Sequence, residues 1–219
     1  MMYELLIAAG AATFAMPAAE AAPDTAGPRI EARIGYDQVD LSGVADSQIN
    51  ARTFADRAGA LAYGAEAGFD FALRSGLTVG PYASIDLSDA SYEEVRAYSD
   101  GRVWAEYTVE AARTVAVGLR LAMLTGRDVN FFVKGGYANG DLSVRYSETI
   151  EPGFNNDAGF DRSGFQLGTG IEVPLGAAYV KGEMSYTSLP TVEYDLGPDF
   201  SARLDGDRLN VMTGIGLRF

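Results

Sequence analysis

Hydrophobic and polar residues alternate along the last twelve residues of the chain, 208–219. One parity is apolar except for Thr213. The other carries glycine and polar residues, including Arg208 and Arg218, with Met212 as its only large apolar member. Because successive side chains of a strand point to opposite faces, this pattern predicts a β-strand with one hydrophobic face and one small or charged face.

Seven earlier segments repeat this alternation, and the connections between the segments are alternately short and long. Short turns are predicted at residues 74–76, 125–128 and 174–176, where glycine occurs each time. Long polar loops are predicted at residues 38–58, 88–104, 139–162 and 188–207. The seven segments are residues 30–36, 61–73, 77–87, 107–121, 129–137, 165–173 and 178–186.

Eight such strands predict an all-β fold, an eight-stranded antiparallel transmembrane β-barrel with four long extracellular loops at one end. The alternative is a soluble β-sandwich, whose strands also alternate. Its strands average about five or six residues, shorter than most of these segments, and the small, charged face would make a poor soluble core. Outside the N-terminus no run of 18 apolar residues occurs, which excludes a helical membrane protein.

If the apolar face meets lipid, the side chains of the opposite face fill the barrel interior, where acids and bases are present in nearly equal numbers. Buried charges must be paired, so we expect an interior plugged by ion pairs. The alternative is a narrow ion or proton path, because many inward positions are glycine. The predicted interior charges are Glu31, Arg33, Glu66, Asp70, Asp86, Glu110, Arg120, Lys134, Glu172, Lys181, Glu183, Arg208 and Arg218.

The N-terminal residues 1–21 resemble a secretory signal peptide, with a short apolar stretch broken by Pro17 and small residues at Ala19 and Ala21. The segment has no Lys or Arg before the apolar stretch, and the alternative is an Ala-rich helix. The expected organisation is a signal peptide (1–21), a short lead (22–28) and the barrel (29–219).

Composition narrows the possible chemistry. The chain has neither Cys nor His, so thiolate chemistry and the usual general base and zinc ligand are absent. The four predicted loops contain 17 acids and 7 Arg and are therefore net negative. This negative charge excludes a surface that binds nucleic acid. These acids are expected to face the solvent. Divalent cations bridging them to the anionic outer leaflet are the alternative, but no ordered ligand spacing occurs. We expect no cofactor, no metal site and a monomer.

Alternation continues weakly beyond some predicted strands, at residues 142–146 and 95–104. These stretches are expected to be ordered bases of the loops. The alternative is extended hairpins that offer sheet edges to a partner protein.

Residues 131–138 (FFVKGGYA), residues 181–186 (KGEMSY) and the terminal strand ending in Phe219 carry a family resemblance. The chain resembles the small outer-membrane β-barrel proteins, such as the OmpA transmembrane domain, OmpX, Ail and the opacity proteins. The resemblance implies a place in the outer membrane of a Gram-negative bacterium, contact with its lipids and lipopolysaccharide, and recognition of Leu217 and Phe219 by the insertion machinery during assembly.

The resemblance specifies architecture much better than activity. We expect a non-enzymatic surface or structural protein that acts in envelope integrity, adhesion or host contact through its acidic loops, with an unknown surface ligand. A narrow porin is the alternative. A lipid-modifying enzyme is a third possibility, disfavoured because the chain lacks the His that such enzymes use.

Overall fold

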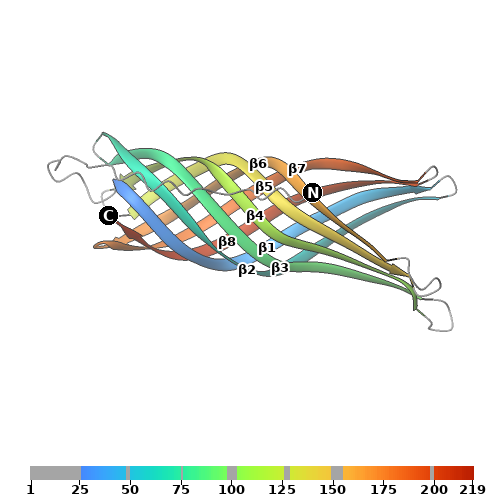
Figure 1. Ribbon diagram of the computed structural model, residues 1–219. Coiled ribbons are helices and arrows are strands. Elements are labelled where there is room, and N and C mark those ends of the chain that lie inside the picture. The colour runs from blue at the N-terminus through green and yellow to red at the C-terminus, as the bar shows by residue number, and fades with distance from the viewer. Residues whose placement is uncertain are drawn as a thin grey trace, which may run out of the picture.

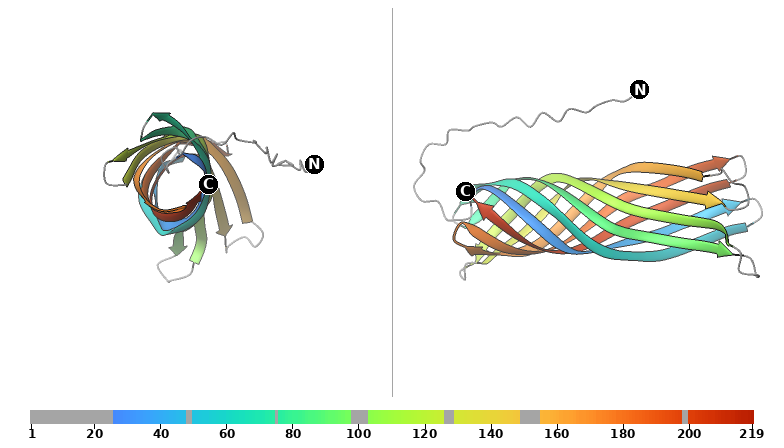
Figure 2. Two further views of the ribbon diagram at one scale, coloured as in Figure 1. Left: turned by 90° about the vertical axis from the view of Figure 1, so that its left-hand side faces the viewer. Right: turned by 60° about the horizontal axis from the view of Figure 1, so that its bottom comes forward.

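A computed structural model describes residues 26–219, except residues 48–49, 75, 98–102, 126–128, 149–154 and 198–199. The described residues form a closed antiparallel barrel in which the strands follow one another in sequence order (Figures 1 and 2). This confirms the predicted eight-stranded barrel. The predicted signal peptide lies outside the described residues and stays a prediction. The strands are β1 (Gly27–Ser47), β2 (Asn50–Arg74), β3 (Leu77–Ala97), β4 (Val103–Thr125), β5 (Val129–Glu148), β6 (Asn155–Leu175), β7 (Ala178–Gly197) and β8 (Phe200–Arg218).

The terminal strand closes the barrel, since β8 pairs with β1 from Arg29↔Arg218 to Ser47↔Phe200. The backbone N–H of Phe219 donates a hydrogen bond to the carbonyl of Pro28 at 3.0 Å. The start of β1 and the C-terminus therefore lie together at the end of the barrel that carries the short turns (Figure 1). Closure leaves no open sheet edge in the lipid, where unpaired amides are costly.

The strands are much longer than the sequence predicted, with lengths of 19 to 25 residues. The predicted long loops at 38–58, 88–104, 139–162 and 188–207 are mostly strand, so that prediction was wrong. A tilted strand needs only about 9–11 residues to cross a bilayer. Each strand therefore continues well beyond the membrane, where its outward face no longer has to be apolar and the alternation fades.

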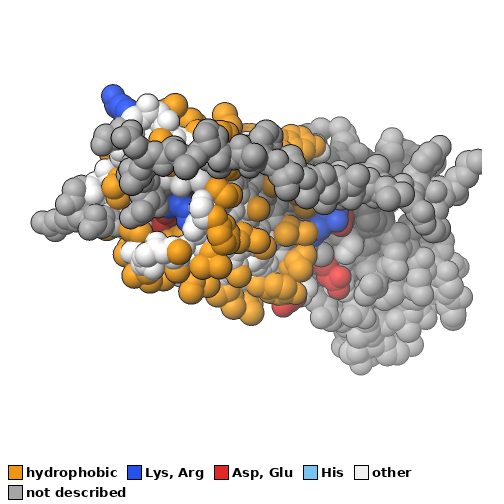
Figure 3. Space-filling model, turned by 60° about the vertical axis from the view of Figure 1, so that its left-hand side comes forward, with side chains coloured by type: hydrophobic (Ala, Val, Ile, Leu, Met, Phe, Trp, Pro, Cys, Tyr) orange, Lys and Arg blue, Asp and Glu red, His pale blue; other side chains and the backbone are white. Residues whose placement is uncertain are grey.

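The two faces of the barrel wall agree with the predicted parity. Outward residues such as Leu119 and Ile215, both 62 % exposed, are apolar, whereas their neighbours Arg120 and Gly216 point inward. Figure 3 shows hydrophobic side chains covering much of the described wall on one face of the molecule. No helix in the described part of the chain is long and apolar enough to cross a membrane.

Candidate functional site: the charged interior of the barrel

The barrel interior holds a connected set of charged side chains to which all eight strands contribute. We call this set the ion-pair network. It contains six bases and six acids and is therefore neutral. Its members are Arg29, Glu31, Arg33, Glu66, Asp70, Asp86, Arg120, Lys134, Glu172, Lys181, Glu183 and Arg218.

Glu66 on β2 is the hub of the network and is 1 % exposed. Its carboxylate accepts hydrogen bonds from Arg29 Nη1 at 2.6 Å, Arg33 Nη1 at 2.9 Å and Lys134 Nζ at 2.7 Å. Lys181 Nζ lies 3.7 Å from the same carboxylate. Four cations from three strands thus surround one acid, and the geometry supplies the partners that a buried charge requires.

Towards the turn end, the network forms a ring of alternating sign. Arg120 lies 2.8 Å from both Asp70 and Glu172, and Arg218 lies 3.0 Å and 2.8 Å from the same two acids. Asn130 adds a hydrogen bond to Glu172 at 3.1 Å. The strands β2, β4, β6 and β8 are tied together across the lumen by these contacts.

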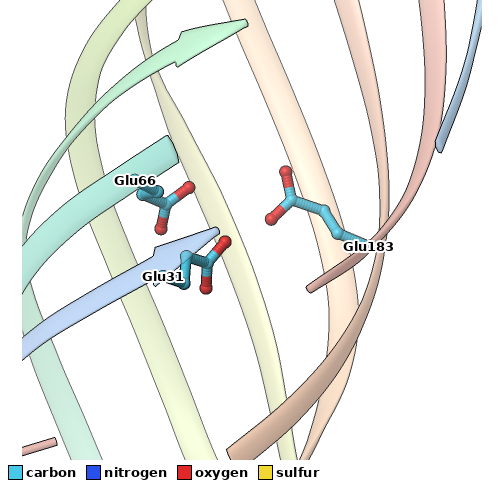
Figure 4. Close-up of side chains that lie close together, drawn as sticks. All are labelled: Glu31, Glu66 and Glu183. Atoms are coloured by element: carbon cyan, nitrogen blue, oxygen red, sulfur yellow. The ribbon is translucent and has the colours of Figure 1, made fainter. Parts of the chain in front are cut away.

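Three acids in the middle of the barrel come close enough to resemble a cation site. Carboxylate oxygens of Glu31, Glu66 and Glu183 all lie within 4.8 Å of one another, and Figure 4 shows the three side chains converging from β1, β2 and β7. However, Lys181 Nζ pairs with all three, and Lys134 Nζ lies 2.5 Å from Glu183. Ammonium groups already neutralise these carboxylates, so the arrangement fits ion pairing better than metal binding.

Two of the predicted interior charges lie outside the ion-pair network. Arg208 is buried nearer the extracellular end, where it pairs with Asp37 and donates a hydrogen bond to Thr114 Oγ1 at 2.5 Å. Glu110 is only half-buried and forms no ion pair with any described residue. Glu110 of β4 lies opposite Ser91 of β3, beyond the point where the β3–β4 register shifts between Leu87 and Ala90 of β3.

Among the residues whose burial the structure describes, sequence reasoning missed three buried charges, namely Arg29, Asp37 and Arg162. Each has the inward parity of its own strand but lies just outside the segment that the alternation defined. Arg29 matters most because it joins Glu66 to Asp70, at 2.6 Å and 3.4 Å, and so connects the middle of the network to the turn end. Extending each predicted strand by a few residues in the same parity would have found all three.

Large rings fill the space that inward glycines leave. A Cβ on Gly170 would stand 2.6 Å from Cζ of Phe132, and a Cβ on Gly216 would overlap the ring of Tyr179. The Phe132 ring also lies 4.6 Å from the guanidinium of Arg120, a cation–π contact. At these positions glycine makes room for an aromatic side chain, which favours a filled interior over water-filled gaps.

Comparison with known proteins agrees with this architecture. The family model described as outer membrane protein beta-barrel domain matches residues 6–219. No curated protein matches the sequence. The outer membrane protease OmpT from Escherichia coli is 10 % identical with a TM-score of 0.53, covering 88 % of this chain and 97 % of that one. Neisserial surface protein A is 11 % identical with a TM-score of 0.49, covering 88 % and 97 %. Ail of Yersinia pestis is 12 % identical with a TM-score of 0.37, covering 85 % and 99 %.

Proposed function

We infer the role of this chain from its family: it belongs to the outer membrane protein β-barrel domain family and lies in the outer membrane of a Gram-negative bacterium. The resemblance to small outer-membrane barrels is thereby confirmed. The family and the fold specify a membrane-embedded barrel with a charge-paired interior. The specific role must be argued from the contents of the barrel and from its extracellular end.

Our proposal is a non-enzymatic surface protein, whose sealed barrel anchors an acidic extracellular sheet for envelope integrity, adhesion or host contact. The observation that carries it is the neutral ion-pair network, which crosses the lumen and takes part of its charge from every strand. A selective pore needs an open lumen and a surplus of one charge, whereas each of the six acids of the ion-pair network has a base within ion-pair distance. An eight-stranded barrel is just wide enough for side chains to fill.

The non-enzymatic part of the proposal rests on residue types and pairing. The chain has no His or Cys to act as base or nucleophile. The buried acids of the network are engaged by Arg and Lys, which removes them as candidate general bases. The name of OmpT describes a protease, but a likeness at 10 % identity shows the shared fold alone.

A sealed barrel predicts that the folded, purified protein gives no steady single-channel conductance in a planar bilayer. The physical reason is that solute would have to break several buried ion pairs to pass, and each broken pair leaves an uncompensated charge. A steady conductance that survives repeated purification of the folded form would contradict the plug and favour a narrow porin.

The surface role predicts a phenotype for a barrel without its extracellular strand ends. In this variant each extracellular hairpin is cut back to one pair of facing residues, and the two strands are rejoined there by an Asn-Gly turn. The four pairs are Asp40↔Arg57, Ser91↔Glu110, Leu142↔Phe160 and Leu189↔Gly206. We expect the variant to keep its heat-modifiable migration on gels, because the membrane-spanning part is intact, and to lose adhesion or resistance to envelope stress. A folded variant with both properties unchanged would reject the surface role.

A further inference from the structure

The outer wall of the barrel is hollowed where β8, β1, β2 and β3 lie side by side. Two facing alanines, Ala32 of β1 and Ala65 of β2, form the floor of the hollow. The residues that flank them across the neighbouring strands are large, since Ile215 of β8 lies opposite Ala32 and Ile85 of β3 lies opposite Ala65. The hollow, which we call the wall groove, has a volume of about 740 Å³ and is open to the outside of the barrel.

A second row of large side chains borders the wall groove on its extracellular side. Ile34 lies opposite Tyr63, and Tyr63 lies opposite Leu87, so that the row is continuous across β1, β2 and β3. All three residues line the groove and point outward. On β7, Val180 lies beside Ile215 and extends the border on that side. The groove is therefore a recess among large side chains, with small residues only at its floor.

The surface of the wall groove is apolar. Arg33 also lines it, but its side chain points into the lumen and pairs with Asp86, so only its backbone reaches the outer wall. Thr213 is the one outward-facing polar side chain on the β8 side of the groove. Its hydroxyl donates a hydrogen bond to the backbone carbonyl of Lys181 at 3.2 Å and is thereby satisfied within the wall. Such a surface suits hydrocarbon and offers little to a polar ligand.

The depth of the wall groove restricts what can enter it. Ala32 is the sixth residue of β1, which begins at Gly27 at the turn end of the barrel. A tilted strand crosses the hydrocarbon layer in about 9–11 residues, so the groove lies near the middle of that layer. The acyl chains of lipids end at this depth, and another membrane protein is the other molecule that reaches it.

The shape of the groove favours an acyl chain over a second copy of the barrel. Two barrels are both convex, so their walls meet only along a narrow line. The large residues that border the groove stand above the alanines of its floor and hold a second wall away from them. A flexible acyl chain can instead bend into the recess and gain van der Waals contacts with its floor and its borders.

We propose that the wall groove binds the end of one acyl chain of a membrane lipid and holds it in a fixed place, while other lipids around the wall exchange freely. In a membrane the burial of apolar surface brings no hydrophobic gain, so close packing is what favours the bound chain. The proposal depends on the position of the wall in the membrane and not on the surface role proposed above. Either of the two can therefore fail without the other.

The test locates acyl-chain ends on the folded, full-length protein. The protein is reconstituted in phosphatidylcholine vesicles with a trace of phosphatidylcholine that carries a photoreactive diazirine at the end of one acyl chain. After illumination, mass spectrometry of peptides identifies the labelled parts of the wall. We expect the peptide that contains Thr213 to be labelled at least about tenfold more than those that contain the exposed Leu119 and Leu167 of the opposite wall. This ratio is equivalent to about 1.4 kcal/mol.

Filling the wall groove should remove this preference. In Ala32→Leu/Ala65→Leu two large side chains occupy the floor, and we expect labelling of the Thr213 peptide, whose own sequence is unchanged, to fall by at least about tenfold. The matched control is Ala67→Leu/Ala83→Leu, which adds the same side chains at another pair of facing, exposed alanines outside the groove lining. It should change labelling by less than about twofold. Heat-modifiable migration on gels shows that both variants are folded.

Three results would overturn the proposal. Labelling spread evenly over the two walls of the parent protein would mean that the groove holds only bulk lipid, and this outcome needs no variant. Equal labelling of the parent and the groove-filling variant, or an equal loss in the folded control, would mean that the recess does not select the chain. Dimers in the vesicles that Ala32→Leu/Ala65→Leu abolishes would mean that the occupant is a second copy of the protein.

Discussion

Replacing Glu66 with Gln is expected to lower the free energy of unfolding more than any other single neutralisation in the barrel. The substitution keeps the shape of the side chain but removes the negative charge that Arg29, Arg33, Lys134 and Lys181 share. Because the four cations stay buried, the cost is that of breaking a buried pair, about 3–5 kcal/mol. Urea titration of the protein in detergent, followed by heat-modifiable migration on gels, measures it.

Two control substitutions make this prediction specific to the network. Asp86 pairs with Arg33 at 2.6 Å and with no second base among the described residues, so Asp86→Asn should cost clearly less than Glu66→Gln. Glu110 is half-buried and lies outside the network, so Glu110→Gln should stay within about 0.5 kcal/mol of the parent. Similar losses for all three variants would mean that general loss of charge, and not the pairing geometry, destabilises the barrel.

The sequence predicted the inward-facing charges well because inward orientation depends only on parity. In β6 and β7, for example, Glu172, Lys181 and Glu183 are buried as their positions in the alternation required. The partners were beyond prediction. Arg33 and Glu183 are 150 residues apart and meet at 3.4 Å only because the strands tilt and close into a barrel with one particular stagger.

The strand lengths were not predictable from the same pattern, for a physical reason. Alternation in a membrane barrel arises because one face meets lipid and the other does not. Beyond the membrane no lipid requires an apolar face, and residues 41–47 of β1 form a ladder with β2 although their sequence does not alternate between apolar and polar. The pattern therefore predicted the membrane-spanning part of each strand, and the extracellular extensions of the strands were wrongly predicted as loops.

A charge placed on the outer wall should destabilise this protein, although the substituted side chain is already exposed. Leu119 is 62 % exposed, and it lies six residues before the end of β4 at Thr125. With about 9–11 residues per crossing, this position falls near the middle of the lipid layer. Leu119→Arg is expected to cost about 2–4 kcal/mol of unfolding free energy in lipid vesicles. In a water-soluble protein an exposed position would tolerate the same change within about 0.5 kcal/mol.

The matched control carries the same substitution at a different depth. Leu73 is 59 % exposed and is the penultimate residue of β2, at the turn end of the barrel. Near the interface the cost of Arg falls to about 0–1 kcal/mol, so Leu73→Arg should refold into vesicles almost as stably as the parent. Equal costs at the two positions would mean that this wall does not face a hydrocarbon layer. A large cost at Leu119 alone would establish that lipid surrounds the exposed apolar wall. The barrel then has apolar side chains outside and charged side chains inside, the reverse of a soluble protein, because the solvent around its wall is lipid.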